Sequence, residues 1–490
     1  MPNRWARGVR VWASCAALVC ALSGDAARAG FEGCEGDCDL DALVSVSDVI
    51  TAVNVGLELA PTTACPAFYY DNPDPNFMDD LMRAVNNALV GCPPPTVTTA
   101  GLVFNGEGNR LNVYEPGPGF FKQTLIPSAA DVPGGEGRDL NAQICFTRGP
   151  AGQIRFIGGE DTNQGGGHNS AGWGFFELSG AVQIGLLDFN QIGKLIPTYQ
   201  TTADGAENYG CGFLSDGRLV TTDVGNQASG LGNGQLIMWF PPFDGGVEYT
   251  ETGVFPLTPV RYCKLDIAIG TAQQIAVDAQ DRIYVGSARD NGLGVGAGVY
   301  RYTGPFPTSD TPAGGCDGTD ATGAPMVTQV TKERFIPSSA NIPTPNGAVI
   351  KPDGGFYVSS VLNGVIAEFD ANGQFVRKVL QPSAPGFPIP TGSPLGFALA
   401  SDGTIYFADV GLVIGPGGIG PGNRTGTVRR VRFVDGQPQP PETLDTGLSF
   451  PDGIGVLELP PPTATPDSEE ERTRRPTSTL GPTRTPLPAP

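Results

Sequence analysis

Short apolar runs recur along this chain in pairs, each pair joined by a tight turn. Within a run, apolar and polar residues alternate, which is typical of a β-strand with one buried face. The turn between two runs carries Asp-Gly, Gly-Gly or a close substitute, as a hairpin requires. The pairs begin at Gly101, Ile144, Cys211, Ile275, Ala348 and Phe397, and the first is the weakest copy. The pattern predicts one hairpin repeated six times.

The spacing of the hairpins predicts a closed ring. Six units over residues 98–459 average roughly 60 residues each, and a four-stranded propeller blade needs about 40–50 residues plus loops. A solenoid would show shorter, uniform repeats with caps, and a β-sandwich would not repeat one hairpin six times. Segment 449–459 has no following hairpin, so we expect it to complete the first blade as its innermost strand and leave no open edge. We therefore expect a mainly β protein, a six-bladed β-propeller.

The ends of the chain differ from the repeats. Residues 1–29 have basic, apolar and small-x-small regions in the order of a secretory signal peptide, with cleavage after Ala29. An uncleaved or lipidated anchor is the alternative. Residues 460–490 are rich in Pro and Thr, so we expect a disordered tail. We expect a secreted or cell-surface protein with no membrane span.

Cysteine content and net charge limit which covalent links and which partners are expected. Outside the signal region, the cysteines fall into an N-terminal group and a repeat group. These are Cys34, Cys38, Cys65 and Cys92, and Cys145, Cys211, Cys263 and Cys316. An oxidising compartment favours disulfides within each group, with buried free thiols as the alternative. The net charge of −20 argues against nucleic acid and anionic membranes as partners.

A calcium-loop pattern precedes the repeats. Counting from Asp37, oxygen-bearing side chains fall at positions 1, 3, 5, 9 and 12, with a backbone carbonyl at 7. The predicted ligands are Asp37, Asp39, Asp41, Leu43 (carbonyl), Ser45 and Asp48. Calcium takes six to eight oxygens from one turn of chain, so this spacing fits. Apolar residues at helical spacing follow, namely Val46, Val49, Ile50, Val53 and Leu57, and predict a helix leaving the loop. An acidic turn that merely caps this helix is the alternative.

Residues 33–93 resemble a dockerin-type pair of calcium repeats, each an EF-hand-like loop with one helix. Asp48 matches the dockerin habit of ending the loop in Asp. The second loop is degraded, keeping Asp71 and Asp80 in register, and Ala42 replaces the usual Gly of the first loop. The resemblance implies a bacterial extracellular protein with a cohesin-like partner, and equally allows a calcium module without a partner.

The repeat region resembles six-bladed propellers of the gluconolactonase/senescence-marker and NHL-repeat groups. The resemblance is carried by three blade openings, Pro345-Asn346-Gly347, Pro394-Leu395-Gly396 and Pro451-Asp452-Gly453. In the lactonase family such openings hold one divalent metal in the central channel, which implies Asn346 and Asp452 as ligands here. Two oxygens do not complete a metal site, and the alternative is that both side chains pair with their own turns.

The other openings carry Ala142, Tyr209, Gln273 and Leu395, which are poor in acids and bases. His168, the one histidine, lies in a Gly-rich stretch, and we do not expect it to be catalytic. Two function classes follow. The first is a calcium-binding extracellular binding or scaffold protein, linked to polysaccharide breakdown through its dockerin-like module and recognising a carbohydrate or small molecule. The second is a metal-dependent, gluconolactonase-like hydrolase of lactones or sugar derivatives. Acids and amides converging in the channel would favour the hydrolase, and a channel plugged by Tyr209 and Leu395 would favour the binder.

Overall fold

The computed structural model describes two parts of the chain. In the N-terminal part these are residues 38, 44–57, 59–61, 64–65, 84–85 and 88. In the repeat region they are residues 101–107, 110–115, 121–127, 140–160, 172–180, 187–195, 208–224, 234–243, 261–289 and 296–458. The predicted signal peptide and Pro/Thr-rich tail lie outside the described residues.

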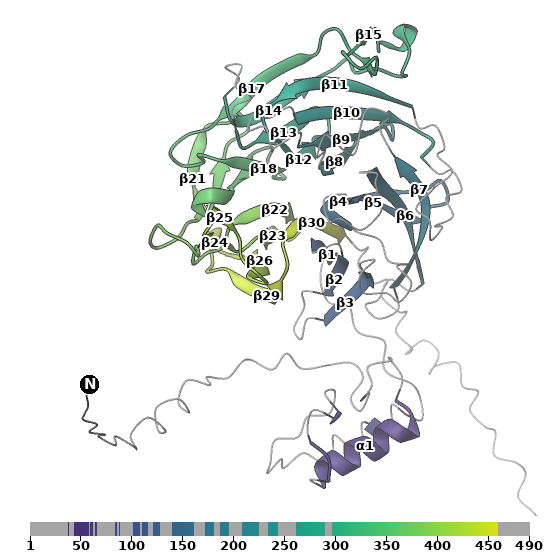
Figure 1. Cartoon of the computed structure of the whole chain (residues 1–490), viewed down its shortest axis with the longest axis vertical. Coiled ribbons are helices and arrows are strands. Elements are labelled where there is room, and N and C mark those ends of the chain that lie inside the picture. The colour runs from purple at the N-terminus through teal and green to yellow at the C-terminus, as the bar shows by residue number, and fades with distance from the viewer. Residues whose placement is uncertain are drawn as a thin grey trace, which may run out of the picture.

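The repeat region forms six four-stranded antiparallel sheets arranged as the blades of a propeller (Figure 1). Blade 1 holds β30 (Pro451–Glu458), β1 (Gly101–Glu107), β2 (Arg110–Glu115) and β3 (Phe121–Ile126). Blade 2 holds β4 (Leu140–Arg148), β5 (Ile154–Glu160), β6 (Gly172–Gly180) and β7 (Leu187–Leu195). Blade 3 holds β8 (Asn208–Phe213), β9 (Leu219–Asp223), β10 (Gly234–Phe240) and β11 (Arg261–Ile269).

The remaining blades follow the same order from the channel outwards. Blade 4 holds β12 (Ala272–Val277), β13 (Ile283–Ser287), β14 (Gly298–Thr303) and β17 (Thr331–Pro337). Blade 5 holds β18 (Pro345–Ile350), β19 (Phe356–Ser360), β20 (Val365–Phe369) and β21 (Phe375–Leu380). Blade 6 holds β22 (Pro394–Leu399), β23 (Ile405–Asp409), β26 (Gly426–Val431) and β29 (Glu442–Leu448). The predicted six-bladed propeller is confirmed.

Short strand pairs decorate the blades. β15 (Gly318–Thr319) and β16 (Pro325–Met326) extend the outer edge of blade 3. The hairpin of β24 (Leu412–Gly415) and β25 (Gly418–Pro421) is inserted between β23 and β26, and β27 (Phe433–Val434) pairs with β28 (Gln437–Pro438).

The two ends of the propeller close one sheet. β30 pairs with β1 in antiparallel register from Gly101↔Glu458 to Gly106↔Gly453, so the predicted closure is confirmed (Figure 1). This arrangement changes the place of the first repeat. The other five hairpins form the two innermost strands of their blades, whereas β1 and β2 are the second and third strands of blade 1. The phase shift explains why the copy beginning at Gly101 matches the others poorly.

The inner strands are buried on both faces, and the expectation of one buried face is wrong for them. Each blade lies between two neighbours, so successive side chains enter different hydrophobic clusters. On β5, Phe156 packs between blades 1 and 2, and the adjacent Ile157 packs between blades 2 and 3. On β13, Ile283 packs between blades 3 and 4, and the adjacent Tyr284 packs between blades 4 and 5. Six such clusters, one at each junction between blades, hold the ring together.

The N-terminal part contains the predicted helix, α1 (Val46–Gly56). Ala52 and Val55 form its buried face and pack against Cys65 and Ala84, whereas Val49 and Val53 are only partly buried. Cys65 is held beside this face by its disulfide with Cys38. Exposed on the other face are Val46 (73%), Ile50 (56%) and Leu57 (58%), with Leu59 (74%) just beyond the helix.

Three disulfides join described cysteines, each within its predicted group. Cys38 bonds Cys65 beside α1. Cys145–Cys211 joins the innermost strands of blades 2 and 3, and Cys263–Cys316 ties the 304–330 segment to β11. Among the described residues, no helix is long and apolar enough to span a bilayer.

Candidate functional site

The blade openings meet at one end of the channel. Because paired strands are antiparallel, the first residues of the innermost strands lie on the same face as the last residues of the second strands. A cavity of about 280 Å³ opens on this face, lined by Tyr209, Gln273, Asn346, Leu395 and Asp452, which are five of the six predicted opening residues. The sixth, Ala142, contacts Asp452 directly.

Asp452 and Asn346 bond to neighbouring blades. The Oδ1 atom of Asp452 accepts a hydrogen bond from the backbone N–H of Ala142 at 2.9 Å. The Nδ2 atom of Asn346 donates to the carbonyl oxygen of Leu395. These contacts differ from the alternative in which each side chain pairs with its own turn. Both side chains are buried, with exposed fractions of 4% for Asp452 and 1% for Asn346, and both hold adjacent blades together around the axis.

The side chain of Tyr209 reaches across the channel. Tyr209 belongs to blade 3, yet its hydroxyl donates to the backbone oxygen of Asp452 in blade 1 at 2.9 Å. The Nδ2 atom of Asn346 in blade 5 approaches the same hydroxyl at 3.4 Å. The tyrosine therefore forms a floor across the axis below the cavity.

A second layer of side chains crosses the axis through glutamines. Gln143 of blade 2 accepts from the N–H of Ile275 in blade 4 at 3.0 Å and donates to its carbonyl at 3.0 Å. Gln274 of blade 4 accepts from the N–H of Phe397 in blade 6 at 3.1 Å and donates to its carbonyl. Each carboxamide thus imitates a strand edge, so the cavity ends in hydrogen-bonded protein and is a blind pocket.

Backbone strain gathers beside Asp452. Ala142 (φ 68°) and Phe450 (φ 56°) are non-glycine residues in the left-handed region, which costs about 1–2 kcal/mol for an L-residue. Strain of this kind persists where the surroundings fix it, and it clusters at binding sites. Gly453 shows how tightly the ring closes here, since a Cβ on it would overlap the carbonyl oxygen of Ala142.

The rim of the pocket is apolar with one basic residue among those described. Leu362 and Phe450 line it and are 46% and 41% exposed, and the β24–β25 hairpin adds Leu412 and Ile419. Arg289, two residues after β13, supplies the positive charge. This rim was not predicted from the sequence. Its signal was present in the Gly-Pro-Gly-Gly turn of residues 415–418, which lies between apolar runs as in a hairpin.

The described residues contain no group of three or more His, Cys, Asp or Glu side chains that could hold a metal ion. Asn346 and Asp452 as metal ligands therefore remain a prediction. His168 lies outside the described residues.

Four of the six predicted calcium ligands, Asp37, Asp39, Asp41 and Leu43, also lie outside the described residues. The other two form a capping box at the start of α1. The Oδ2 atom of Asp48 accepts from the N–H of Ser45 at 2.9 Å and its Oδ1 from the N–H of Cys38 at 3.3 Å.

Asp48 therefore turns back toward the beginning of the loop, as a calcium loop needs, and also caps the helix, as the alternative holds. Burial favours a raised pKa for Asp48, but hydrogen bonds from Ser45 and Cys38 outweigh it and lower the pKa below its usual value. An ionised carboxylate of this kind suits a hard cation.

The fold and pocket define a six-bladed β-propeller with a blind axial pocket. No family profile and no curated protein matches the chain. Among solved structures, the chain is similar to a protein of unknown function from Bacteroides caccae, with 10% identity, a TM-score of 0.38, and coverage of 74% of this chain and 100% of that one.

A streptogramin B lyase shares 13% identity over 73% of this chain and 90% of that one, with a TM-score of 0.36. A gluconolactonase from Xanthomonas campestris shares 12% identity over 61% of this chain and 75% of that one, with a TM-score of 0.32. Likeness at this level does not transfer an activity.

Proposed function

We propose that the propeller is a binding module that takes a small organic molecule in the blind pocket at the channel end. The observation that carries this proposal is the hydrogen bond from the hydroxyl of Tyr209 to Asp452, which closes the floor beneath an apolar rim. Apolar walls with a few placed polar groups are the usual make-up of a small-ligand site. The pocket volume of about 280 Å³ suits a compact ligand.

The metal-dependent hydrolase is supported less well. Hard divalent cations take six or more oxygens, and Asp452 is the one carboxylate among the described lining residues. Its Oδ1 atom already accepts from Ala142, and Asn346 donates to Leu395. Because these contacts join blades, recruiting both side chains to a metal would weaken the ring.

The binding proposal is tested with N-phenyl-1-naphthylamine, a neutral dye whose fluorescence rises in apolar sites. Ile419→Asp places a charge on the rim, and Ile414→Asp is the matched control: it pairs with Ile419 across the same hairpin and does not line the pocket. Both variants carry Ile50→Asp as well, which is intended to suppress dye binding at the exposed apolar face of α1. We expect Ile419→Asp to weaken binding about tenfold or more and Ile414→Asp to leave it unchanged. Equal affinities for the two variants would refute the site.

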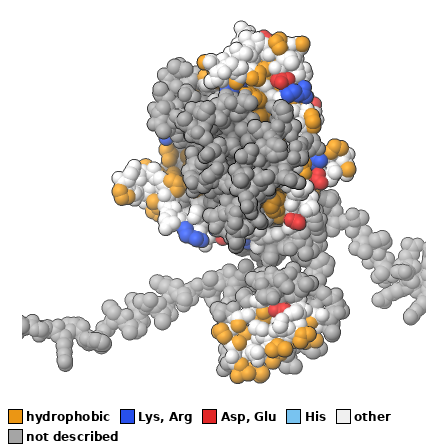
Figure 2. Space-filling view, turned by 45° about the vertical axis from the view of Figure 1, so that its right-hand side comes forward, with side chains coloured by type: hydrophobic (Ala, Val, Ile, Leu, Met, Phe, Trp, Pro, Cys, Tyr) orange, Lys and Arg blue, Asp and Glu red, His pale blue; other side chains and the backbone are white. Residues whose placement is uncertain are grey.

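A second function is favoured by the exposed apolar stripe of α1. We propose that Val46, Ile50, Leu57 and Leu59 contact a cohesin-like protein partner. Each is more than half exposed, and hydrophobic side chains gather on this surface (Figure 2). Contiguous exposed apolar surface of this kind marks an interaction site.

The partner proposal is tested by surface plasmon resonance with a cohesin-type domain. We expect binding by the full chain in calcium, and loss of binding in the Val46→Asp/Ile50→Asp variant. Leu362→Asp, on the propeller, serves as the control that should bind normally. Binding that survives the α1 substitutions, or that never occurs, would overturn this role.

A further inference from the structure

Arg289 differs from most described cations of the propeller in its contacts. Other basic side chains are paired, as in Arg155–Glu177 at 3.0 Å and Arg377–Glu368 at 2.6 Å. The side chain of Arg289 forms no ion pair or hydrogen bond with the described residues, although the chain carries 50 acidic residues against 30 lysines and arginines. A guanidinium over a cavity with no partner among the described residues is a ready partner for a carboxylate or sulfonate, to which it donates two parallel hydrogen bonds.

The backbone that carries Arg289 is held in place. The Oγ atom of Ser287 donates to the carbonyl oxygen of Arg289 at 3.0 Å and accepts from the N–H of Thr271 at 3.2 Å. The same carbonyl packs so closely on Gly270 that a Cβ there would overlap it. The backbone at Arg289 is therefore fixed before a ligand arrives, so that only the side chain has to be ordered on binding.

Gln273 offers a second recognition group in the pocket wall. The residue is 6% exposed, and its Oε1 atom is buried with no hydrogen-bond partner among the described residues. The backbone of Gln273 cannot turn away easily, because its carbonyl accepts from the Oγ1 atom of Thr222 at 2.7 Å. Buried acceptors are nearly always satisfied in native proteins, so a donor is expected here, and a ligand in the cavity supplies it once the carboxamide rotates toward the lumen.

Resting on the binding function proposed above, we propose that this pocket selects an organic anion that carries a hydrogen-bond donor. The apolar body would lie against Leu362, Leu412 and Phe450. The acidic group would pair with Arg289, and the donor would reach the carboxamide oxygen of Gln273. The negative charge of the whole chain repels anions at long range, so Arg289 decides which anions remain bound.

Two dyes separate charge recognition from apolar binding. 8-Anilinonaphthalene-1-sulfonate and N-phenyl-1-naphthylamine share the aromatic body and the N–H, and only the first carries an anionic group. In the Ile50→Asp background, we expect Arg289→Gln to raise the Kd of the sulfonate about tenfold and that of the neutral dye less than twofold. Arg148→Gln, an equal change of net charge at an exposed residue that does not line the pocket, should alter neither.

The outcomes distinguish this inference from the binding function. If both dyes respond to Ile419→Asp but the sulfonate ignores Arg289→Gln, the pocket is real and the anion selectivity is wrong. If neither dye responds to Ile419→Asp, the binding function itself fails. Gln273→Met keeps the length of the side chain and removes the acceptor, and a melting curve checks that the variant folds. We expect Gln273→Met to raise the Kd of both dyes about fivefold. Unchanged Kd values would show that the ligand donates no hydrogen bond to Gln273.

Discussion

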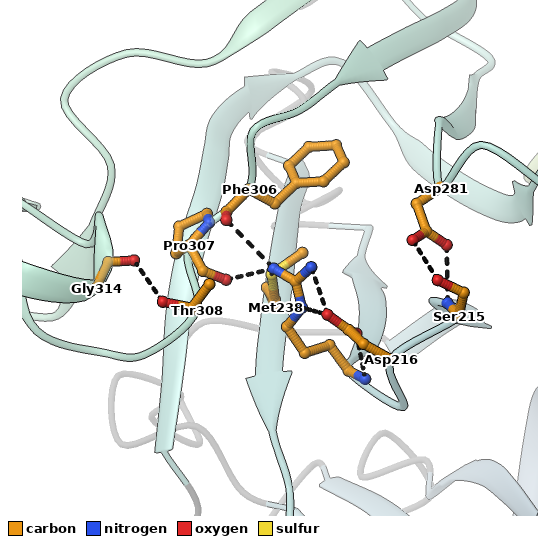
Figure 3. Close-up of polar contacts among 9 residues, drawn as sticks. Ser215, Asp216, Met238, Asp281, Phe306, Pro307, Thr308 and Gly314 are labelled. Carbon is orange, nitrogen blue, oxygen red and sulfur yellow. Dashed lines mark hydrogen bonds and ion pairs between the residues drawn. The ribbon is translucent and has the colours of Figure 1, made fainter.

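Ser215 donates hydrogen bonds to both carboxylate oxygens of Asp281 across the junction of blades 3 and 4. Its N–H donates to Oδ1 at 2.7 Å and its hydroxyl to Oδ2 at 2.6 Å (Figure 3). The same pair of hydrogen bonds recurs where the ring closes. The N–H and the hydroxyl of Ser401 in blade 6 donate to the two carboxylate oxygens of Glu458 at 2.7 and 2.8 Å. Both serines begin a Ser-Asp-Gly turn, so one turn sequence shapes a hairpin and also ties it to the next blade.

The closing pair predicts a measurable contribution to stability. Ser401→Ala removes one charge-assisted hydrogen bond, and we expect the free energy of unfolding to fall by about 1 kcal/mol, since the pair is exposed to water. Urea unfolding of the full chain measures this loss. Ser215→Ala should cost a similar amount, whereas Ser309→Ala removes an exposed hydrogen bond to the neutral hydroxyl of Thr311 and is the control that should cost less. A loss smaller than the error of the urea measurement in both Ser401→Ala and Ser215→Ala would show that water replaces these bonds.

Gly453 predicts a much larger effect. A Cβ on this residue would overlap the carbonyl of Ala142, and backbone cannot move aside as a side chain can. We expect Gly453→Ala to destabilise the propeller by about 3 kcal/mol or more, seen as a lower midpoint in thermal unfolding. Gly217→Ala is a comparison of a different kind, because no atom lies within 4 Å of its added Cβ and only its φ of 84° opposes the change. It should cost about 1–2 kcal/mol, and the reverse order of the two losses would contradict the crowding argument.

The buried pair of Lys264 and Asp320 predicts sensitivity to acid. Burial alone would raise the pKa of Asp320, but hydrogen bonds from Lys264, Thr322 and Ala324 lower it to about 2 from an ordinary 3.8. A carboxylate with a lowered pKa contributes stability that is present above pH 4 and is lost as the pH falls toward 2. Asp320→Asn should therefore flatten this part of the stability curve.

The same variant should also cost about 3 kcal/mol near neutral pH, because it removes the carboxylate that is hydrogen-bonded to the buried Lys264. The control is Lys264→Met/Asp320→Asn, which removes both charges of the pair and should recover part of the loss, since the buried Asp223 then loses its attraction to Lys264. Both measurements use denaturant unfolding between pH 2 and 7. If the double variant is as unstable as the single one, packing and not charge explains the effect.

The calcium loop predicts that a chelator changes the N-terminal part and spares the propeller. If calcium is bound at the loop beginning at Asp37, removing it should lower the melting temperature of the part that holds α1, because the metal binds only the folded loop. Differential scanning calorimetry with calcium and with chelator measures this shift. Asp39→Asn, which removes a predicted ligand charge, should reduce the shift. An unchanged transition in both solvents would favour the capping-box alternative for Ser45 and Asp48.

Much of the fold was readable from local pattern. Alternating apolar residues on either side of Asp-Gly turns identified the hairpins, and segment 449–459, which has no hairpin of its own, identified the closing strand. The opening residues were also found, because Tyr209, Asn346 and Asp452 hold equivalent positions in the repeat and a ring brings equivalent positions to one axis. The pairing of cysteines within groups followed from the same organisation.

Other features depend on tertiary contacts that the repeated sequence pattern does not predict. The alternating pattern distinguishes the two faces of a strand, but both faces are buried because each blade packs between two neighbours, as Phe156 and Ile157 show. Likewise α1 was predicted by its 3.6-residue spacing, whereas the face it buries depends on where Cys65 and Ala84 lie. Arg289 and the hairpin carrying Ile419 share no sequence pattern. They meet because strands from different blades converge on one channel, and such long-range convergence leaves no periodic trace along the chain.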